Sequence, residues 1–306
     1  MLEYSINNQG LRQTSPPKKN SVKAIFVLSL LIFLGAFFLI KNIFLNTSSE
    51  EVPSSFNSSK ELLNEIHSLT PPALGTYAVY IYDINSGEEL GINEQMIFTA
   101  ASLNKLAILA VLYQEASDNQ IDLDKIIVPQ KEDIQDYGTG SIRYDPPNTP
   151  YSIKTLAKLM IEQSDNTAAH LLGNIVIGLP QIQKQIEDWD LLQTDMVNNK
   201  TSAKDMALLL RKIYKGEITS RPYTLEMLEF MNKTDFEERI PTGIPRDVKT
   251  YHKTGDEIGK IHDAAIVELP NKPYILVVLS SEIKDEEKAK QTIAQISRNV
   301  YEFMKK

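Results

Sequence analysis

The stretch HKTGDEIGKIHDAAIVELPNKPYILVVLSS, residues 252–281, has the clearest β-structure pattern in this chain of 306 residues. With the residues just before it, its β-branched and aromatic side chains predict strands at 248–253, 260–269 and 274–280. Pro-Asn-Lys-Pro at 270–273 predicts a tight hairpin between the last two strands. Working outward, TYAVYIYDI at 76–84 and the residues at 89–92 predict two further strands near the other end of the folded part.

The residues between these two groups of strands have helical spacing. Helices are predicted at 61–69, 103–116, 153–163, 167–177, 203–215 and 285–304, with a further helical stretch to about 192. The helix at 103–116 is apolar almost all round, which predicts that it is buried. The order of the predicted strands and helices along the chain favours an α/β (α+β) fold. One antiparallel sheet is built from both chain ends and covered by the terminal helices, and the middle forms an all-helical subdomain.

Composition excludes several kinds of site. The formal net charge is −8, which argues against a nucleic-acid partner, because phosphate binding needs a basic face. The chain has no cysteine, so disulfides, thiol nucleophiles and thiolate-bound metals are excluded. Its four histidines show no metal-ligand spacing. We therefore predict neither a metal nor a cofactor.

The amino-terminal residues predict a membrane anchor. AIFVLSLLIFLGAFFLI, residues 24–40, carries no charge, and apolar residues continue to 45. This approaches the roughly 20 apolar residues that span a bilayer. A cleaved signal peptide is the alternative, but no A-x-A site follows. We predict a tail at 1–23, a transmembrane helix at 24–45, a flexible linker at 46–60 and a catalytic domain at 61–306.

Charges on the two sides of this segment predict its orientation. Basic residues precede it, whereas two glutamates follow it. The positive-inside rule then places the amino terminus in the cytoplasm and the folded domain outside the cell. The expected location is the cell membrane, as a single-pass protein.

Ser-x-x-Lys, the first of three short motifs, can make a serine nucleophilic, because residues three apart on a helix share a face. It occurs at Ser15–Lys18, Ser102–Lys105 and Ser281–Lys284. Only Ser102 begins a predicted buried helix, where free backbone N–H groups favour a developing negative charge. The alternative for Ser102 is an ordinary helix N-cap.

Two further motifs follow in the sequence. Ser-Asp-Asn occurs at 117–119, where it ends a predicted helix, and at 164–166, where it joins two helices. In the second copy we expect Asp165 to hold the loop through backbone hydrogen bonds. Lys253-Thr254-Gly255 ends the strand predicted at 248–253 and could bind a substrate carboxylate, with Gly255 letting the substrate backbone approach. Each motif alone also fits an ordinary turn or strand end.

The three motifs in this order resemble the signature of class A β-lactamases and penicillin-binding proteins. FTAASLNK (98–105), GTGSI (138–142), LMIEQSDNTAAHLLG (159–173), TSAKDMALLL (201–210) and the 252–281 stretch all resemble class A segments. The resemblance covers essentially everything after residue 61 and implies that family's fold.

The resemblance implies acyl transfer through Ser102, with Lys105 as its base and Ser164 as a proton shuttle. It implies substrate contacts at Asn166, Lys253, Thr254 and Gly255. The oxyanion hole would be formed by the backbone N–H groups of Ser102 and Asp256. We expect burial and the nearby Lys253 to lower the pKa of Lys105, which must be neutral to act as a base.

The sequence departs from the class A pattern in two places. No E-x-x-L-N occurs in the short segment 193–200, so the omega-loop glutamate that activates the deacylating water is missing. Asp195 is the only acid there, and we do not assign it that role. Asp256 stands where the family usually has a small residue, and its charge could repel an anionic substrate.

Three functions are therefore compared. The first is a β-lactamase-like serine hydrolase that hydrolyses β-lactams, with slow deacylation. The second is a D,D-peptidase or penicillin-binding protein that acts on cell-wall peptides. The third is a sensor domain that binds β-lactams without turnover. All three motifs are intact, which favours an enzyme over the sensor. The partners expected are a small-molecule β-lactam or a cell-wall peptide, and the membrane.

Overall fold

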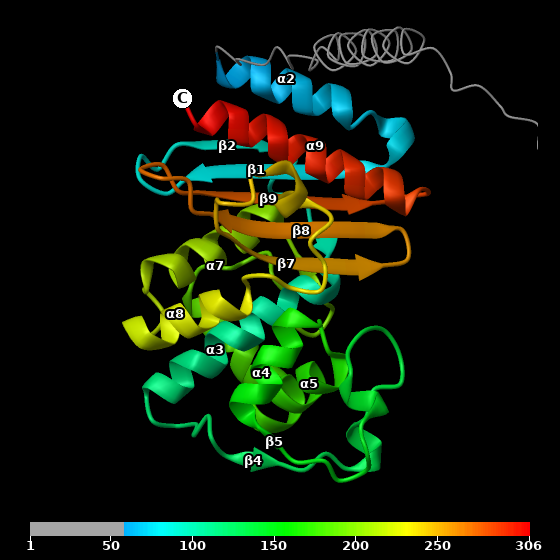
Figure 1. The fold of residues 1–306 in the computed structure, drawn as a ribbon, viewed down its shortest axis with the longest axis vertical. Helices are drawn as coiled ribbons and strands as arrows, with labels where there is room; N and C mark the ends of the chain where they lie inside the picture. The colour runs from blue at the N-terminus through cyan, green and yellow to red at the C-terminus, as the bar shows by residue number, and fades with distance from the viewer. Residues whose placement is uncertain (1–57) are drawn as a thin grey trace, which may run out of the picture. The chain divides into compact units, whose positions relative to one another are not determined.

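The central sheet has five antiparallel strands in the order β2-β1-β9-β8-β7 in the computed structural model, which describes residues 58–306. The strands are β1 (Thr76–Asp83), β2 (Glu89–Ile92), β7 (Thr250–Glu257), β8 (Lys260–Val267) and β9 (Tyr274–Ser281). β1 pairs with β9 along its whole length, with Val79 opposite Val278 (Figure 1). The sheet predicted from both ends of the chain is therefore confirmed.

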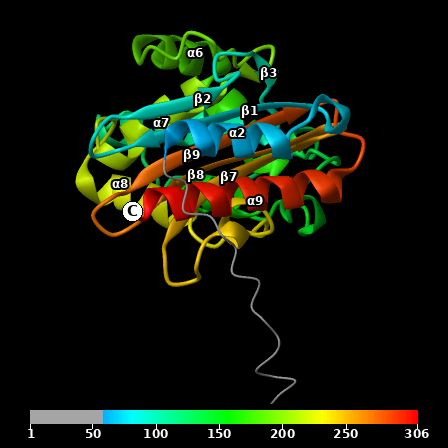
Figure 2. The same cartoon turned by 90° about the horizontal axis from the view of Figure 1, so that it is seen from above.

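Helices cover both faces of the sheet. α2 (Ser59–Leu69) and α9 (Glu286–Met304) lie next to each other across one face (Figure 2). α7 (Ala203–Lys215) packs against the other face. Because successive strand residues point to opposite faces, Val278 belongs to the core beneath α9, whereas Val277 belongs to the core shared with the helical part.

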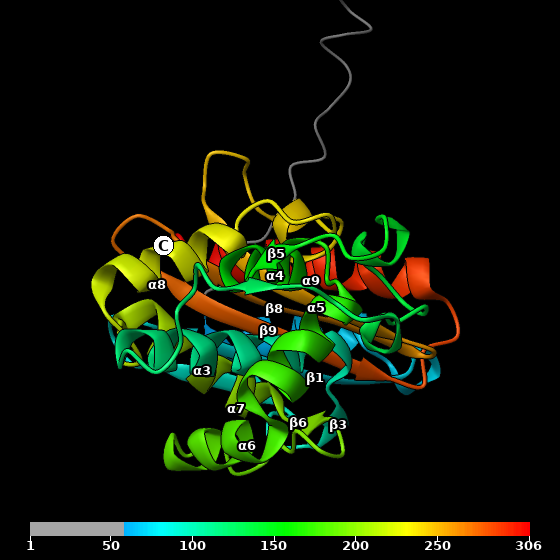
Figure 3. The ribbon, with the colours of Figure 1, turned by 90° about the horizontal axis from the view of Figure 1, so that it is seen from below.

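The middle of the chain forms the predicted helical subdomain (Figure 3). Its elements are α3 (Lys105–Ser117), α4 (Ile153–Glu162), α5 (Asn166–His170), a π-helix (Leu171–Ile177) and α6 (Leu179–Asp188), and α8 (Arg221–Phe230) packs against α3. Short strand pairs join β3 (Phe98–Thr99) to β6 (Lys200–Thr201) and β4 (Ile126–Ile127) to β5 (Tyr151–Ser152). α3 is buried almost all round, as predicted.

The strand predicted at 248–253 was misplaced. β7 begins at Thr250 and continues through the Lys-Thr-Gly motif to Glu257, so the motif lies within the strand. Glu257 pairs with Lys260 across a two-residue turn, in which Gly259 has a φ of 72°. Glycine adopts this left-handed conformation without steric cost, and the turn therefore lets the strand extend.

Three helix predictions also need correction. The helix predicted at 167–177 divides into α5 and the π-helix, and the one predicted at 103–116 is preceded by a 3₁₀ turn, η2 (Ala101–Asn104). The stretch extended to 192 ends at Asp188 instead. α8 was not predicted, because its interior apolar spacing is weak, although Pro222 occupies its first turn, where proline is favoured.

The predictions for 1–23, for 24–45 and for 46–57 of the linker lie outside the described residues. Between residues 58 and 306, no helix is both long and apolar enough to cross a membrane.

Candidate active site

Ser102 lies in the 3₁₀ turn η2, immediately before α3, and Lys105 is the first residue of α3. Ala101 has a φ of 49°, a left-handed conformation that is unusual for a residue with a side chain. Such strain persists only where the surroundings impose it, and it is common at functional sites. Ser102 is half-buried, whereas Lys105 is only 6% exposed.

Lys105 connects the first motif to the second. Its Nζ donates to the backbone oxygen of Ser164 at 2.6 Å and to Asn166 Oδ1 at 2.8 Å, and it lies 3.2 Å from Ser164 Oγ. These contacts hold the amine beside the turn that carries Ser102. The predicted approach of the two motifs is present in the fold.

Lys253 brings in the third motif. Its Nζ donates to Ser164 Oγ at 3.0 Å and to the Thr254 carbonyl at 2.9 Å. Lys253 is 1% exposed. Ser164 Oγ therefore has two lysine amines within hydrogen-bonding distance, one from the start of α3 and one from strand β7.

Burial changes the protonation of both lysines. It lowers the pKa of Lys105 well below the usual 10.5, and the charge of Lys253 lowers it further. Burial also lowers the pKa of Lys253, to about 7, although Asp256 acts in the opposite direction. The direction expected for Lys105 agrees with this environment. A lysine with such a lowered pKa can accept a proton near neutral pH.

The Ser-Asp-Asn loop is held by backbone hydrogen bonds, as expected for Asp165. Its carboxylate accepts from the N–H groups of Ala168 at 2.8 Å and Ile142 at 3.0 Å. Gly140 packs so closely that a Cβ there would lie 2.1 Å from Asp165 Oδ2. The GTGSI segment is thus the support on which the second motif rests.

Asn166 is hydrogen-bonded to the protein at both ends of its side-chain amide. Its Oδ1 accepts from Lys105, and its Nδ2 donates to the Tyr137 carbonyl at 3.1 Å. Each of these atoms can make a second hydrogen bond, so a substrate amide can bind here without displacing either contact.

Gly255 packs closely against the turn that carries Ser102. A Cβ at this position would lie 3.0 Å from the Ala100 carbonyl oxygen and 3.2 Å from the Leu103 side chain. The glycine therefore lets strand β7 pack against η2. It brings the third motif close to Ser102, and the expected approach of the substrate backbone to Gly255 stays a prediction.

Asp256 has a partner that sequence reasoning missed. Arg239 Nη2 lies 2.6 Å from Asp256 Oδ1, and Arg239 Nη1 donates to the His262 carbonyl at 2.6 Å. Arg239 is 1% exposed, whereas the Asp256 side chain is 42% exposed. No motif marks Arg239, because a lone arginine in a loop gives no pattern in the sequence.

Two adjoining cavities contain Ser102. The larger, about 530 Å³, is also lined by Lys105, Asn166 and Asp256, and the smaller, about 310 Å³, by Ser164, Phe236 and Asp256. Residues that sequence reasoning missed also line the larger cavity: His170, Asn174, Met196 and Asn199.

The segment that replaces the omega loop contributes no acid to these cavities within residues 58–306. Met196 and Asn199 line the cavity, but Asp195 does not. The Asp195 carboxylate accepts from the Asn198 side chain and from the backbone N–H groups of Val197 and Asn198, and these hydrogen bonds lower its pKa. The observation agrees with leaving Asp195 without a catalytic role.

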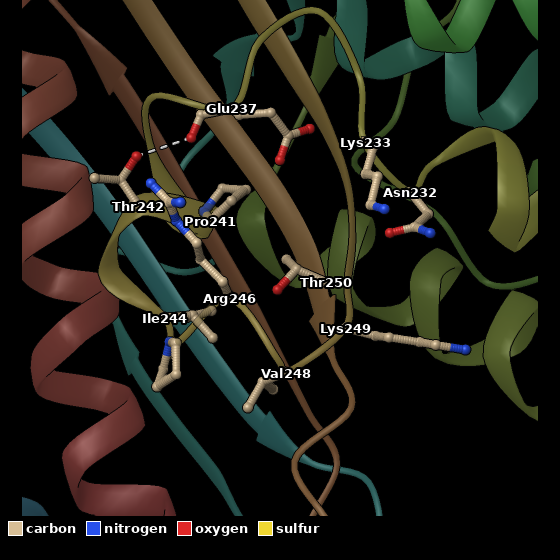
Figure 4. Close-up of a pocket in the computed structure, with 11 residues that line it drawn as sticks. Asn232, Lys233, Glu237, Pro241, Thr242, Ile244, Arg246, Val248, Lys249 and Thr250 are labelled. Atoms are coloured by element: carbon tan, nitrogen blue, oxygen red, sulfur yellow. Dashed lines mark hydrogen bonds between the residues drawn. The ribbon is translucent and has the colours of Figure 1, made fainter.

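A separate cavity of about 620 Å³ lies inside the loop that precedes β7 (Figure 4). None of the motif residues lines it. One of its residues, Glu237, accepts from the Thr242 hydroxyl through its backbone oxygen, as the dashed line in Figure 4 marks. The Glu237 carboxylate reaches the buried His252 at 3.2 Å, and His252 contacts Asp263 at 3.0 Å. These charges support the strand that carries Lys253.

Among the described residues, no group of three His, Cys, Asp or Glu side chains could hold a metal ion.

Comparison with known proteins identifies the family to which this fold belongs. Residues 61–304 match the family model described as "Beta-lactamase enzyme family". The chain belongs to this family. It is 24% identical to the extended-spectrum beta-lactamase PER-1 of Pseudomonas aeruginosa, over 82% of this chain and 90% of the relative. It is 27% identical to beta-lactamase 1 of Bacillus cereus, over 71% and 73%.

Solved structures of this family superpose on the described domain. A mutant of PBP-A, captured as an acyl-enzyme complex with penicillin G, is 29% identical, with a TM-score of 0.74, over 79% of this chain and 95% of that chain. A beta-lactamase from Sphaerobacter thermophilus has the same TM-score at 22% identity, which shows the shared fold. The chain is thus a serine hydrolase of the beta-lactamase enzyme family.

Proposed function

We propose that Ser102 attacks the amide carbonyl of a β-lactam and is acylated. Lys105 accepts the hydroxyl proton, the new bond joins Ser102 Oγ to the carbonyl carbon, and the C–N bond of the ring breaks. Ser164 then passes a proton to the departing nitrogen. The observation that supports this most directly is the position of Ser164 Oγ, within 3.2 Å of the Lys105 amine and 3.0 Å of the Lys253 amine.

The other site residues would bind the substrate. The backbone N–H groups of Ser102 and Asp256, which both line the two cavities, would stabilise the oxyanion. Asn166 would bind the acyl-side amide. Lys253 and Thr254 would contact the leaving-group side, where Lys253 also influences the pKa of Lys105.

Deacylation is slow in this proposal. Hydrolysis of the acyl-serine needs a group that activates water, and the segment at 193–200 places Met196 and Asn199 in the cavity and no carboxylate. Asp256 and Glu257 also line the cavity, but each is paired with a cation, so the acyl-enzyme persists and Lys105 is the unpaired base beside Ser164 that remains to hydrolyse it.

A D,D-peptidase acting on cell-wall peptides is the second candidate. It uses the same acylation, and the missing acid favours it, because a peptidase need not hydrolyse β-lactam adducts quickly. The similarity to PBP-A over almost all of that chain agrees with this alternative. We also propose that residues 24–45 anchor the enzyme in the cell membrane with the domain outside, where cell-wall peptides would be accessible.

Intact mass measured over time tests these functions. The full-length protein is incubated with penicillin G, and Ser102→Ala serves as the control. We expect an adduct with the mass of the whole penicillin, dependent on Ser102, that persists for many minutes. Loss of the adduct within seconds would contradict slow deacylation, and no adduct at all would contradict the β-lactam substrate. Release of D-alanine from a D-Ala-D-Ala peptide would support the peptidase.

A further inference from the structure

Asp256 places a carboxylate where the leaving-group side of a substrate would bind. Side chains alternate along a strand, so Asp256 and Thr254 point to the same face of β7. Asp256 lines both cavities that contain Ser102, and its side chain is 42% exposed. A substrate group that enters either cavity at this end of β7 therefore passes close to this charge.

Arg239 is the cation in contact with Asp256, and the two side chains already form an ion pair. The guanidinium is buried, with Nη2 2.6 Å from Asp256 Oδ1 and Nη1 2.6 Å from the His262 carbonyl. A buried guanidinium needs such a partner, because a buried and uncompensated charge is strongly destabilising. The arginine is thus not available to a substrate carboxylate unless Asp256 moves away.

Among the described residues, Lys105 is the one lysine or arginine that lines the larger cavity, and burial lowers its pKa. Asp256, Glu257 and Glu286 all line the smaller cavity, and no lysine or arginine of residues 58–306 lines it. Glu257 pairs with the partly exposed Lys260 at 2.7 Å, whereas Asp256 pairs with an arginine that is buried and lines neither cavity, so this second pair presents its negative end to the cavities. Burial lowers the pKa of Lys253 to about 7, which reduces the positive charge that it supplies near neutral pH. The leaving-group side is therefore neutral to negative.

We propose that Asp256 determines substrate specificity by discriminating against a carboxylate on the leaving-group side. The favoured substrates are amides or lactams whose leaving group carries an uncharged or positively charged substituent there, such as an ester, an amide or an ammonium group. This inference rests on the proposed acylation of Ser102. Two like charges brought to about 4 Å at a partly exposed site disfavour binding by about tenfold or more.

The ratio of two acylation rates tests the proposal. The full-length protein is reacted with penicillin G and, separately, with its uncharged methyl ester, and the second-order rate constants are measured by intact mass. We expect the ratio of acid to ester to rise about tenfold or more in Asp256→Asn, because the repulsion is removed and Arg239 is freed. The ratio cancels any general loss of activity that the substitution causes.

Glu257→Gln is the matched control, because it removes one negative charge from the adjacent residue that lines the same cavities. We expect its ratio to stay within about twofold of the wild type, since the positive charge of Lys260 is partly exposed beside Glu257, whereas that of Arg239 is buried behind Asp256. If the acid-to-ester ratio rose equally in both variants, the effect would come from general surface charge, and the proposed role of Asp256 would be overturned. An unchanged ratio in a folded Asp256→Asn would also overturn it.

The wild type alone provides a second measurement, in case Asp256→Asn does not fold. Salt screens repulsion between partly exposed charges, so the acid-to-ester ratio should rise with ionic strength. A ratio independent of salt would contradict the proposal. If neither the acid nor the ester acylates Ser102, the proposed function itself fails, and that outcome differs from an unchanged ratio.

Discussion

The Ser164 hydroxyl lies 3.0 Å from the Lys253 amine, although the two residues are 89 positions apart in the sequence. The same oxygen is 3.2 Å from the amine of Lys105. A hydrogen-bonded route therefore runs from the first motif, through the second, to the third. Because both amines are buried, their protonation depends on each other and on this route.

Lys105 should carry the proton transfer of acylation. In Lys105→Gln, the side-chain amide can still donate to the Ser164 carbonyl, but no base remains. We expect the acylation rate with penicillin G to fall about 10²–10⁴-fold with little change in melting temperature. The acylation rate is measured by intact mass after the reaction is quenched at successive times. Thermal unfolding is the control that shows whether the variant is folded. An unchanged rate in a folded variant would remove Lys105 from the mechanism.

The pH profile of acylation should report the lowered pKa of Lys105. Only the neutral amine accepts a proton, and its pKa lies well below 10.5, so the rate should reach its plateau well below that pH. Because Lys253 helps to lower this pKa, Lys253→Gln should move the midpoint to higher pH. A wild-type midpoint near the pKa of a free lysine would contradict this account.

A carboxylate at Met196 should speed the loss of the acyl group. Met196 is buried and lines the cavity that contains Ser102. Burial raises a carboxyl pKa, which suits a general base, so Met196→Glu should shorten the lifetime of the penicillin adduct about tenfold or more. Met196→Gln has the same size without the charge. Equal lifetimes in the two variants would mean that the missing acid is not what limits deacylation.

Gly140 should be required for the Ser-Asp-Asn loop. Its φ is 113°, and an added Cβ would lie 2.1 Å from Asp165 Oδ2. Gly178 is a matched control, because its φ is 98° but nothing lies within 4 Å of the added Cβ. We expect Gly140→Ala to lower the free energy of unfolding by about 1–3 kcal/mol more than Gly178→Ala, because overpacking adds to the backbone strain. Denaturant unfolding measures both, and equal losses would contradict the steric argument.

His252 should make stability depend on alkaline pH. Burial lowers its pKa, but Asp263 and Glu237 together raise it to about 9, above the usual 6.5. The protonated histidine therefore stabilises the fold fully below pH 6.5, and this contribution is lost as the pH rises through about 9. The stability difference between wild type and His252→Asn should shrink across that window, measured by urea unfolding at each pH. A difference that does not vary with pH would show that His252 is neutral.

Local pattern was sufficient for most of the elements, because each depends on neighbouring residues. The helix predicted at 203–215 has the observed bounds of α7, and the strand predicted at 89–92 has those of β2. The strand predicted at 248–253 shows the limit of prediction from local pattern. Thr254 to Glu257 has no alternating apolar pattern, and these residues are extended because β8 pairs with them.

The sequence by itself determined which residues are the candidates for the chemistry: a serine with a lysine three positions later, Ser-Asp-Asn between two helices, and Lys-Thr-Gly near the carboxyl end. Only the tertiary structure decided how they meet and what modifies them. The pKa of Lys105 and the pairing of Arg239 with Asp256 depend on burial and on distances between residues far apart in the chain. Electrostatic energies vary with distance and with the surrounding dielectric, and neither quantity exists until the chain has folded.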